Sequence, residues 1–551
     1  MTQNLWGLRM LKRAYDIGPI SIINRMTSGR GVGTSMGRNR PAVAGRTATS
    51  LEDGASQHLA LIILVGLLLA GAILRIANLL LEASLWEDEI FSVALAESPL
   101  ADLFLTGLRF DTHPPLYYVQ LHFWGAIANS DRWYILNSTL LSIVSVVVIF
   151  ECCRRIYDER VGLWAAAIQS LMPLQLFFAE NVRMYPMFAI LAITLWYVLQ
   201  TIVRHGASSR ARLFAVACLG VATTLTHGLG FFVTFFIFLH ALIQFYGQTS
   251  RRNAIFLVGS YVPVALTAIY PLVIGAIRRT EGIAVFDVPT IGIHLTMTLL
   301  GPEFPWPTVA GLVALPLLVF VPLVEPRARM LCGMLVLLPL FTLFGISVLF
   351  KPVFIYRTIG LFLPFLAIAM ALCADTAFRR KARMPRVWIS AMILTMLAGG
   401  VNYTINFEKR GYREIVTELK TASSENDVIL AGSPSVFWAV TRYLDGDHTR
   451  RSALEVQPPV RDGMLRVKQK LEDLGATSLG LFGQTDHIRI ADRTVYPFFA
   501  GEPASKLPAF WVLNPAEGGC ASIGEDGSRY HVVNEISASS QRAIQCRRSG
   551  L

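Results

Sequence analysis

Eleven separate apolar runs constrain this chain more than any other feature of its sequence. Most are long enough, or nearly so, to cross a bilayer as a helix, which takes about 20 mainly apolar residues. The run at 211–227 is the weakest because it is short and rich in threonine. Together the runs predict a polytopic α-helical membrane protein. They fall at about 59–80, 133–152, 161–178, 186–203, 211–227, 230–247, 254–277, 307–324, 330–350, 358–374 and 387–402.

The composition indicates the same class of protein. Of the 551 residues, 53% are hydrophobic and only 16% are charged, and the mean hydropathy of +0.49 is too high for one soluble core. A net charge of +11 would suggest nucleic acid in a soluble protein. Here the basic residues lie in short loops between apolar runs, where they act as topology signals. We therefore expect membrane lipid as a partner and no nucleic acid.

The basic loops predict an orientation in the membrane. The first 50 residues carry eight Lys or Arg against a single acid, Asp16, and contain no recognisable cleavable signal peptide. We expect a disordered cytoplasmic tail over residues 1–57. An odd number of spans then leaves residues 403–551 outside the cytoplasm. The loops that become cytoplasmic are all basic, as the positive-inside rule requires, and lie at 154–160, 204–212, 248–253, 325–329 and 375–386.

Two shorter apolar segments are not counted as spans. Residues 114–129 begin at a proline pair and contain Gln120 and His122, and a stretch of about sixteen residues is more typical of an interfacial helix. Counting this segment would also move the basic loop 154–160 to the outer face. Residues 291–301 are predicted to form a second interfacial helix. The transmembrane domain then covers 58–402, with a first outer loop at 82–132.

After residue 403 the composition becomes that of an ordinary soluble domain. Helix-like patterns at 411–420, 435–444 and 464–475 alternate with strand-like segments at 427–432, 477–483 and 509–514, which predicts a small α/β domain over 403–551. Its two cysteines, Cys520 and Cys546, would form a disulfide in an oxidising compartment, with two free buried thiols as the alternative. No spacing typical of a zinc site occurs in the chain.

The first outer loop holds the densest acidic cluster of the chain, directly after the first apolar run. Ionisable groups at such a position are costly and commonly belong to a substrate site, although a solvated loop is the structural alternative. Glu87, Asp88 and Glu89 follow Trp86. Adjacent acids can hold a divalent cation or act as a general base toward a hydroxyl. They also suit the start of a helix, so alone they leave both readings open.

A second polar segment of this loop joins Asp111 and His113 to two prolines. The prolines would start the next helix at a fixed place and hold both side chains rigidly at the membrane surface. A capping role would explain Asp111, but it does not explain the neighbouring His113.

Two cationic clusters are predicted on the same outer face. Residues 180–185 precede a span and contain Arg183, whose fork-shaped donors suit phosphate; an arginine that only marks the membrane border is the alternative. Residues 351–357 lie between two spans and contain Lys351 and Arg357. Cations on the outer face run against the positive-inside preference and indicate an anionic partner. Acids and cations at a lipid surface together indicate transfer chemistry on a lipid-linked phosphate.

The segments LWEDEIFS, DTHPPLYY, AENVRMY and VFIYRTIGLFLP resemble the GT-C superfamily of polyprenyl-phosphate-sugar-dependent glycosyltransferases. The most similar branch is that of protein O-mannosyltransferases and bacterial aminoarabinose–lipid A transferases, and the resemblance covers roughly 59–402. It implies a catalytic acid at Asp88, with Glu89 beside it. Substrate-binding roles then fall on Asp111, His113, Arg183, Tyr185, Lys351 and Arg357.

The chain departs from the family pattern at two places. The cation near the end of the pattern is usually an Arg-Tyr pair, whereas Thr358 follows Arg357 here. The aminoarabinose branch has a lysine before its proline pair, where this chain has His113. This difference argues against assuming the aminoarabinose substrate.

The sequence thus predicts a GT-C-like membrane glycosyltransferase that moves one sugar, with inversion, from a polyprenyl-phosphate donor to an extracytoplasmic acceptor. The resemblance places it in a bacterial inner membrane. No cofactor is required, although a divalent metal remains possible because some relatives use one. A transporter or flippase for a lipid-linked sugar is the main alternative, and it predicts charged groups deep inside several spans and internal repeats. A membrane sensor is a third, but eleven spans exceed what an anchor needs.

Overall fold

The structure, a computed structural model, divides into two compact units, Met1–Gly66 and Leu67–Leu551. Helix α2 (Ala44–Leu81) crosses the boundary between them, and the description below concerns the second unit. The residues that the structure describes are 44–81, 84–97, 99–100, 103, 113–206, 209–245, 251–269, 288–301, 325–350, 353–381, 383–406, 411–424, 426–431, 434–444, 488–490, 493–497, 509–514, 520, 530–538 and 541–548.

Long apolar helices dominate the described residues. Six helical segments there are long and apolar enough to cross a membrane, and a seventh is present if the bent pair α8–α9 counts as one span. The predicted polytopic helical fold is therefore confirmed. The six segments are 61–81 of α2, α7 (Asp131–Ile156), α10 (Tyr185–His205), α17 to α18 (Pro326–Leu349), α19 to α20 (Tyr356–Arg379) and α21 (Arg383–Asn406).

Ten of the eleven predicted runs fall on described helices, and the run at 307–324 lies outside the described residues. Three of the ten fall on the shorter helices α11 (Arg210–Thr224), α12 (Gly230–Phe245) and α13 (Arg251–Thr267). The two segments predicted not to cross the membrane form helices too short to do so. They are α6 (Leu116–Gly125) and α15 (Val288–Leu300).

The broken helix places one of the site motifs. Helix α8 (Glu159–Leu171) is followed by α9 (Pro173–Glu180) at an angle of 65°. Pro173 has no backbone N–H and cannot continue the hydrogen-bond pattern of α8, so carbonyls at the end of α8 lose their helical partners. Arg75 of α2 supplies a replacement, because its Nη1 donates to the Ser170 carbonyl at 2.6 Å. The end of α9 leads directly into the segment that carries Arg183.

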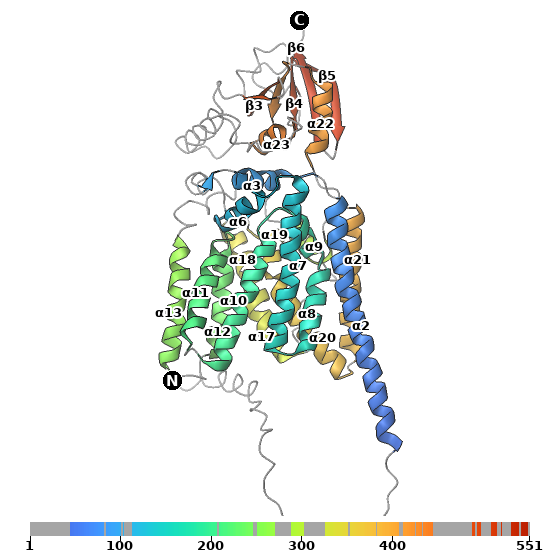
Figure 1. The fold of residues 1–551 in the computed structure, drawn as a ribbon, viewed down its shortest axis with the longest axis vertical. Coiled ribbons are helices and arrows are strands. Elements are labelled where there is room, and N and C mark those ends of the chain that lie inside the picture. The colour runs from blue at the N-terminus through green and yellow to red at the C-terminus, as the bar shows by residue number, and fades with distance from the viewer. Residues whose placement is uncertain are drawn as a thin grey trace, which may run out of the picture. The chain divides into compact units, whose positions relative to one another are not determined.

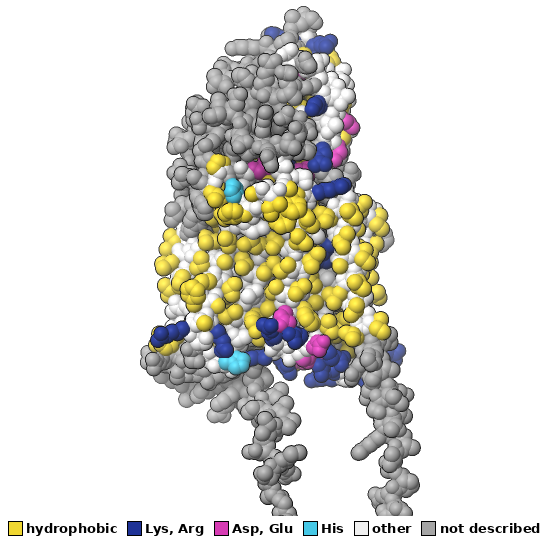
Figure 2. Space-filling model, viewed as in Figure 1, with side chains coloured by type: hydrophobic (Ala, Val, Ile, Leu, Met, Phe, Trp, Pro, Cys, Tyr) yellow, Lys and Arg dark blue, Asp and Glu magenta, His cyan; other side chains and the backbone are white. Residues whose placement is uncertain are grey.

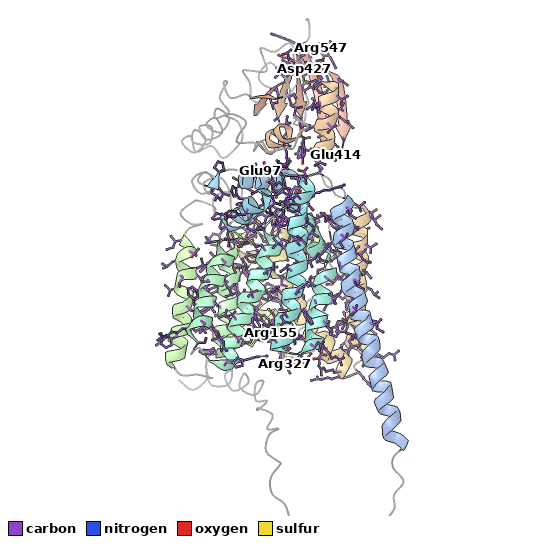
Figure 3. The ribbon with its side chains drawn as sticks, viewed as in Figure 1. Glu97, Arg155, Arg327, Glu414, Asp427 and Arg547 are labelled. Carbon is purple, nitrogen blue, oxygen red and sulfur yellow. A yellow bond between two sulfur atoms is a disulfide. The ribbon has the colours of Figure 1, made fainter. Side chains whose placement is uncertain are left out.

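The helices of the second unit run side by side in Figure 1, where α7 packs against both α8 and α10. Helix α20 (Leu363–Arg379) packs on α8 and is buried along most of its length. Hydrophobic side chains cover the visible sides of these helices in Figure 2, with Lys and Arg gathered along one edge. Figure 3 labels Arg155 and Arg327 at that end and Glu97 at the opposite end. Two of the predicted cytoplasmic loops therefore share one end, and the acidic loop lies at the other.

The C-terminal region forms a six-stranded sheet, which confirms the predicted small α/β domain. The strand order is β2-β3-β1-β4-β6-β5, in which β1 is parallel to β3 and β4 and the other pairs are antiparallel. The predicted helix at 464–475 and strand at 477–483 lie outside the described residues. The elements are α22 (Arg413–Ala422), β1 (Val428–Ala431), α23 (Pro434–Leu444), β2 (Ile488–Ile490), β3 (Arg493–Pro497), β4 (Ala509–Leu513), β5 (Tyr530–Ala538) and β6 (Gln541–Arg548).

A disulfide joins Cys520 to Cys546 of β6, with their Cα atoms 5.7 Å apart. Both cysteines belong to the buried apolar cluster between β4, β5 and β6. The alternative of two free thiols therefore does not apply to the structure.

One buried carboxylate ties the C-terminal domain to the membrane helices. Asp131, the first residue of α7, is fully buried and accepts hydrogen bonds from Arg413 at 2.6 Å, Arg442 at 2.7 Å and Tyr443 at 2.6 Å. Arg442 also donates to Glu97 at 3.2 Å. A buried acid is tolerated only when it is paired and hydrogen-bonded, and this one has both arginines and a hydroxyl.

Candidate active site

The acidic cluster of the first outer loop begins helix α3 (Glu87–Glu97). Glu89 is fully buried, and one of its carboxylate oxygens accepts a hydrogen bond from the backbone N–H of Trp86 at 3.0 Å, which caps the helix start. Its other oxygen accepts from the backbone N–H of Val182 at 2.7 Å. Glu89 thus fastens the outer loop to the segment that follows α9.

Asp88 lies on the same helical turn, but its side chain is partly exposed to solvent. Its side chain is 34% exposed, and its Oδ2 pairs with Nη1 of Arg357 at 2.5 Å. The Arg357 guanidinium lies over the Trp86 ring, 4.8 Å from its centre, and its Nε donates to the Tyr356 hydroxyl at 3.0 Å. The indole and the phenol hold the guanidinium in a defined orientation.

Arg183 contacts the same helix. It is buried, and its Nη1 donates to the Asp88 carbonyl at 3.2 Å and to the Ser92 hydroxyl at 3.0 Å. The Trp86 indole N–H donates to Asn181 at 2.8 Å, so the segment around Arg183 is fixed to α3 by side chains as well as by Glu89. Arg183 is therefore not an arginine that merely reaches toward the membrane border.

Two histidines face each other beside these arginines. The rings of His113 and His227 lie 4.6 Å apart, although they come from different loops. The backbone N–H of Gly228 donates to His113 Nδ1 at 3.3 Å, and that of Leu229 donates to His227 Nδ1 at 3.0 Å. A backbone bond from Leu116 N–H to the Leu225 carbonyl joins the two loops further.

Burial, and then the charges of Arg183 and Arg357, hold the pKa of His113 well below its usual value. Burial, His113 and Arg183 do the same to the pKa of His227. Both imidazoles are therefore neutral near pH 7. Because each Nδ1 accepts a hydrogen bond from a backbone amide, the ring proton of each lies on Nε2. Each histidine thus presents a neutral N–H donor, His113 near Arg183 and Arg357 and His227 near Arg183.

The aromatic ring of Tyr185 also lies in this region. Its ring stacks on Phe178 with centres 4.0 Å apart and lies 5.7 Å from the His227 ring. Tyr185 begins α10 after Met184, and the proline at position 186 suits the first turn of a helix. The Tyr185 ring therefore lies next to His227 as well as Phe178.

The structure brings together six of the eight predicted site residues: Asp88, Glu89, His113, Arg183, Tyr185 and Arg357. Asp111 and Lys351 lie outside the described residues. Within the described ranges no three His, Cys, Asp or Glu side chains gather closely enough to hold a metal ion.

His227 is a candidate site residue that the sequence analysis did not identify. It ends the weak apolar run 211–227, and the loop to the next run is so short that it was not counted among the outer loops. The predicted topology nevertheless places this junction on the same face as the acidic loop. A histidine between Thr226 and Gly228 at such a junction is the signal that would have indicated it.

Comparison with protein families gives a match to dolichyl-phosphate-mannose-protein mannosyltransferase over residues 112–274. This match covers less than a third of the chain and includes His113, Arg183, Tyr185 and His227. It confirms the resemblance to the GT-C superfamily of membrane glycosyltransferases that the outer-face motifs predict. The comparison with curated protein sequences gives no match.

Solved structures with similarity to this chain include the Archaeoglobus fulgidus oligosaccharyltransferase in the apo form. That match has 12% identity and a TM-score of 0.44, and covers 70% of this chain and 64% of the other. The chain thus spans less than two thirds of the archaeal protein's length. A second is ArnT from Cupriavidus metallidurans bound to undecaprenyl phosphate, with 12% identity, a TM-score of 0.38, and coverage of 88% of this chain and 97% of the other.

Proposed function

We propose that this protein is an integral membrane glycosyltransferase that transfers one sugar from a polyprenyl-phosphate donor to an acceptor hydroxyl. The observation that carries the proposal is the meeting of Asp88 and Arg357 at 2.5 Å, with Arg183 and two neutral histidines beside them. The carboxylate can accept the proton of the acceptor hydroxyl, and the neighbouring N–H groups can donate hydrogen bonds to the phosphate that leaves. The family match over 112–274 supports this choice.

In the proposed reaction Asp88 removes the proton of the acceptor hydroxyl. The acceptor oxygen attacks the anomeric carbon as the bond from that carbon to the phosphate oxygen breaks. The electron pair of the broken bond leaves with the polyprenyl phosphate, which Arg357 and Arg183 stabilise. The Nε2–H groups of His113 and His227 donate to the same phosphate or to a sugar hydroxyl. A single displacement of this kind inverts the anomeric configuration.

Glu89 has a separate task in this proposal. It is fully buried, and both of its carboxylate oxygens accept backbone hydrogen bonds. We assign it to holding the loop that carries Asp88, and we assign the general base role to Asp88 alone. Tyr185 orients His227, and Asp111 and Lys351 remain candidates for binding the sugar or the phosphate.

The expected orientation belongs to the same proposal. Residues 1–57 would be cytoplasmic, 58–402 would form the transmembrane domain of a bacterial inner membrane, and 403–551 would lie outside the cytoplasm with the active site. Reporter fusions near residues 205, 251 and 380 should report cytoplasm, and a fusion near residue 450 should report the outer compartment. A cytoplasmic signal at 450 would remove the proposed face of the active site.

Transfer itself is tested with purified protein in lipid vesicles and a panel of polyprenyl-phosphate sugars. Mass spectrometry of lipids and envelope glycans from cells with and without the protein identifies the sugar and the acceptor. We expect one glycan species to lose a single sugar in the cells that lack the protein. Accumulation of an unmodified lipid-linked sugar on one leaflet, with no glycan altered, would instead indicate a transporter.

Within the described helices, Arg75 bears on the transporter alternative. It is buried inside a predicted span, where a charged group often marks a transport pathway. Its guanidinium donates hydrogen bonds to the Gly71 and Ser170 carbonyls and to the Ser142 hydroxyl. These contacts fit a cap for the broken helix α8, and we therefore retain the transferase proposal.

A further inference from the structure

The C-terminal domain contacts the residue next to the proposed base. The hydroxyl of Tyr412, immediately before α22, donates a hydrogen bond to the Glu87 carboxylate. Glu87 and Asp88 are the first two residues of α3. Tyr412 is fully buried, and among the described residues no other side chain is seen to hydrogen-bond the Glu87 carboxylate. The phenol therefore holds the turn from which Asp88 projects.

The direction of this hydrogen bond is set from inside the C-terminal sheet. The side-chain amide of Asn514, just after β4, donates to the Tyr412 oxygen at 3.3 Å and to Gln541 at 2.5 Å. An amide N–H can only donate, so the Tyr412 oxygen accepts there and its own proton points to Glu87. Asn514 has a φ of 53°, a conformation uncommon outside glycine, and two contacts to Arg542 hold it in place.

Two further bonds fix the residues just before α3. The backbone N–H of Leu85 donates to the Tyr443 hydroxyl at 3.2 Å, and the backbone N–H of Arg413 donates to the Ser84 hydroxyl at 3.0 Å. Both partners belong to the C-terminal domain. Residues 84, 85 and 87 are thus each held by that domain, while Asp88 itself makes its side-chain bond to Arg357.

We propose that Tyr412 is a positioning residue for Asp88, so that the C-terminal domain is part of the catalytic unit rather than an appended module. The inference rests on the proposed function, because it assigns Asp88 the base role. The paired Asp131 cluster already provides a structural joint between the two domains, and Tyr443 links it to the backbone of Leu85 just before α3. The chain from Asn514 through Tyr412 to Glu87 instead ends one residue from the base. Misplacement of a catalytic group by about 1 Å can cost up to about 100-fold in rate.

The test uses Tyr412→Phe in the full-length protein, which keeps the ring and removes the hydroxyl. We expect kcat to fall about tenfold with the KM for the lipid donor unchanged, since the phosphate contacts are not touched. Glu87→Ala, which removes the acceptor, should have a similar effect, and the double variant should be no worse than either single one, because both remove the same contact. Hydrogen exchange should rise in residues 84–92 and stay constant in residues 209–224.

Tyr261→Phe is the matched control. Tyr261 lies on α13, and its hydroxyl makes a 3.1 Å hydrogen bond to Thr234, so the same substitution removes one bond far from α3. We expect this variant to keep the wild-type kcat and the wild-type exchange in residues 84–92.

Three results would overturn the inference: unchanged exchange in 84–92, unchanged kcat, or single effects that multiply in the double variant. Hydrogen exchange needs no substrate, so it separates the inference from the proposed function. If wild-type protein transfers no sugar, the proposed function fails. The exchange of residues 84–92 then still decides whether Tyr412 holds this turn.

Discussion

The Asp88 carboxylate and the Arg357 guanidinium form an ion pair at 2.5 Å although 269 residues separate them in the chain. The pair joins the start of α3 to the segment before α20. It places a carboxylate that can accept a proton next to a guanidinium that can bind phosphate. A carrier phosphate that binds Arg357 must compete with Asp88 for the same guanidinium. Donor binding would therefore leave the carboxylate free to accept a proton.

Asp88→Asn separates these two roles. The amide keeps the shape of the side chain and removes its basicity, so turnover should fall by about 100-fold or more. Affinity for the lipid donor should stay the same or increase, because Arg357 loses a competing anion. Turnover and donor affinity are measured on the same purified variant. Near-normal transfer by the folded variant would rule out Asp88 as the base.

Arg357→Ala should affect binding of the donor first. Loss of a charge-assisted contact costs about 1.5–3 kcal/mol, or roughly a tenfold to 150-fold weaker affinity. Arg327→Ala provides a control, since Arg327 lies at the end of the helices opposite Glu97 of α3 (Figure 3). This variant should leave donor affinity unchanged. If Arg357→Ala lowers turnover while donor affinity stays normal, Arg357 does not hold the phosphate.

The two histidines give the stability a pH dependence. Their pKa values lie below the usual 6.5 in the folded protein, so the unfolded chain binds protons first as the pH falls. Stability is then fully present above about pH 6.5 and decreases below it, by at most about 1.4 kcal/mol per pH unit for each histidine. Thermal unfolding between pH 7 and pH 5 measures this decrease.

His227→Gln should reduce the loss of stability over that pH range. His205→Gln, at the exposed end of α10, serves as the control and should leave the slope as it is in the wild type. An identical pH slope in the His227 variant and the wild type would mean that His227 takes up no proton on unfolding.

Arg442→Ala tests the joint between the two domains. The substitution leaves Asp131 fully buried without one of its two arginines, and breaking a buried pair costs about 3–5 kcal/mol. Arg542→Ala is the control, since its partner Glu535 and Arg542 itself are about half exposed and such pairs contribute about 0–1 kcal/mol. Equal melting temperatures for the two variants would contradict the proposed importance of Asp131.

The disulfide should be present in protein taken from the native membrane. Closing a loop with a sequence separation of 26 residues stabilises the folded domain by about 3–4 kcal/mol in the chain-entropy model. Peptide mapping without reductant should find Cys520 linked to Cys546. Full alkylation of both thiols before reduction would instead place the domain in a reducing compartment and oppose the expected orientation.

The sequence predicted the helical membrane fold because span length is a local property, read from apolar runs alone. Short polar motifs on the predicted outer face also indicated candidate site residues, and the structure brings six of them together. It did not reveal His227, because that residue joins the candidate site through its ring contact with His113, which lies 114 residues away along the chain. Periodicity carries no information about such pairing.

The same limit applies to the contacts of the C-terminal domain. Its alternation of helices and strands was readable from the sequence, yet the bonds from Tyr412 to Glu87 and from Arg442 to Asp131 join residues more than 300 positions apart. Glu89 and Asp88 are adjacent carboxylates, and the sequence alone does not show which of them is available for chemistry. Only its burial and its two backbone partners distinguish the two acids.

The double attachment of Glu89 limits how this site can be engineered. One side chain spans the gap between the backbone of Trp86 and that of Val182, so an aspartate, shorter by one methylene, would reach only one of them. A chimera that imports a foreign outer loop must therefore import the matching segment after α9 as well. Residues 86–92 and 180–183 depend on each other structurally, and mutant libraries aimed at a new acceptor should vary both segments together.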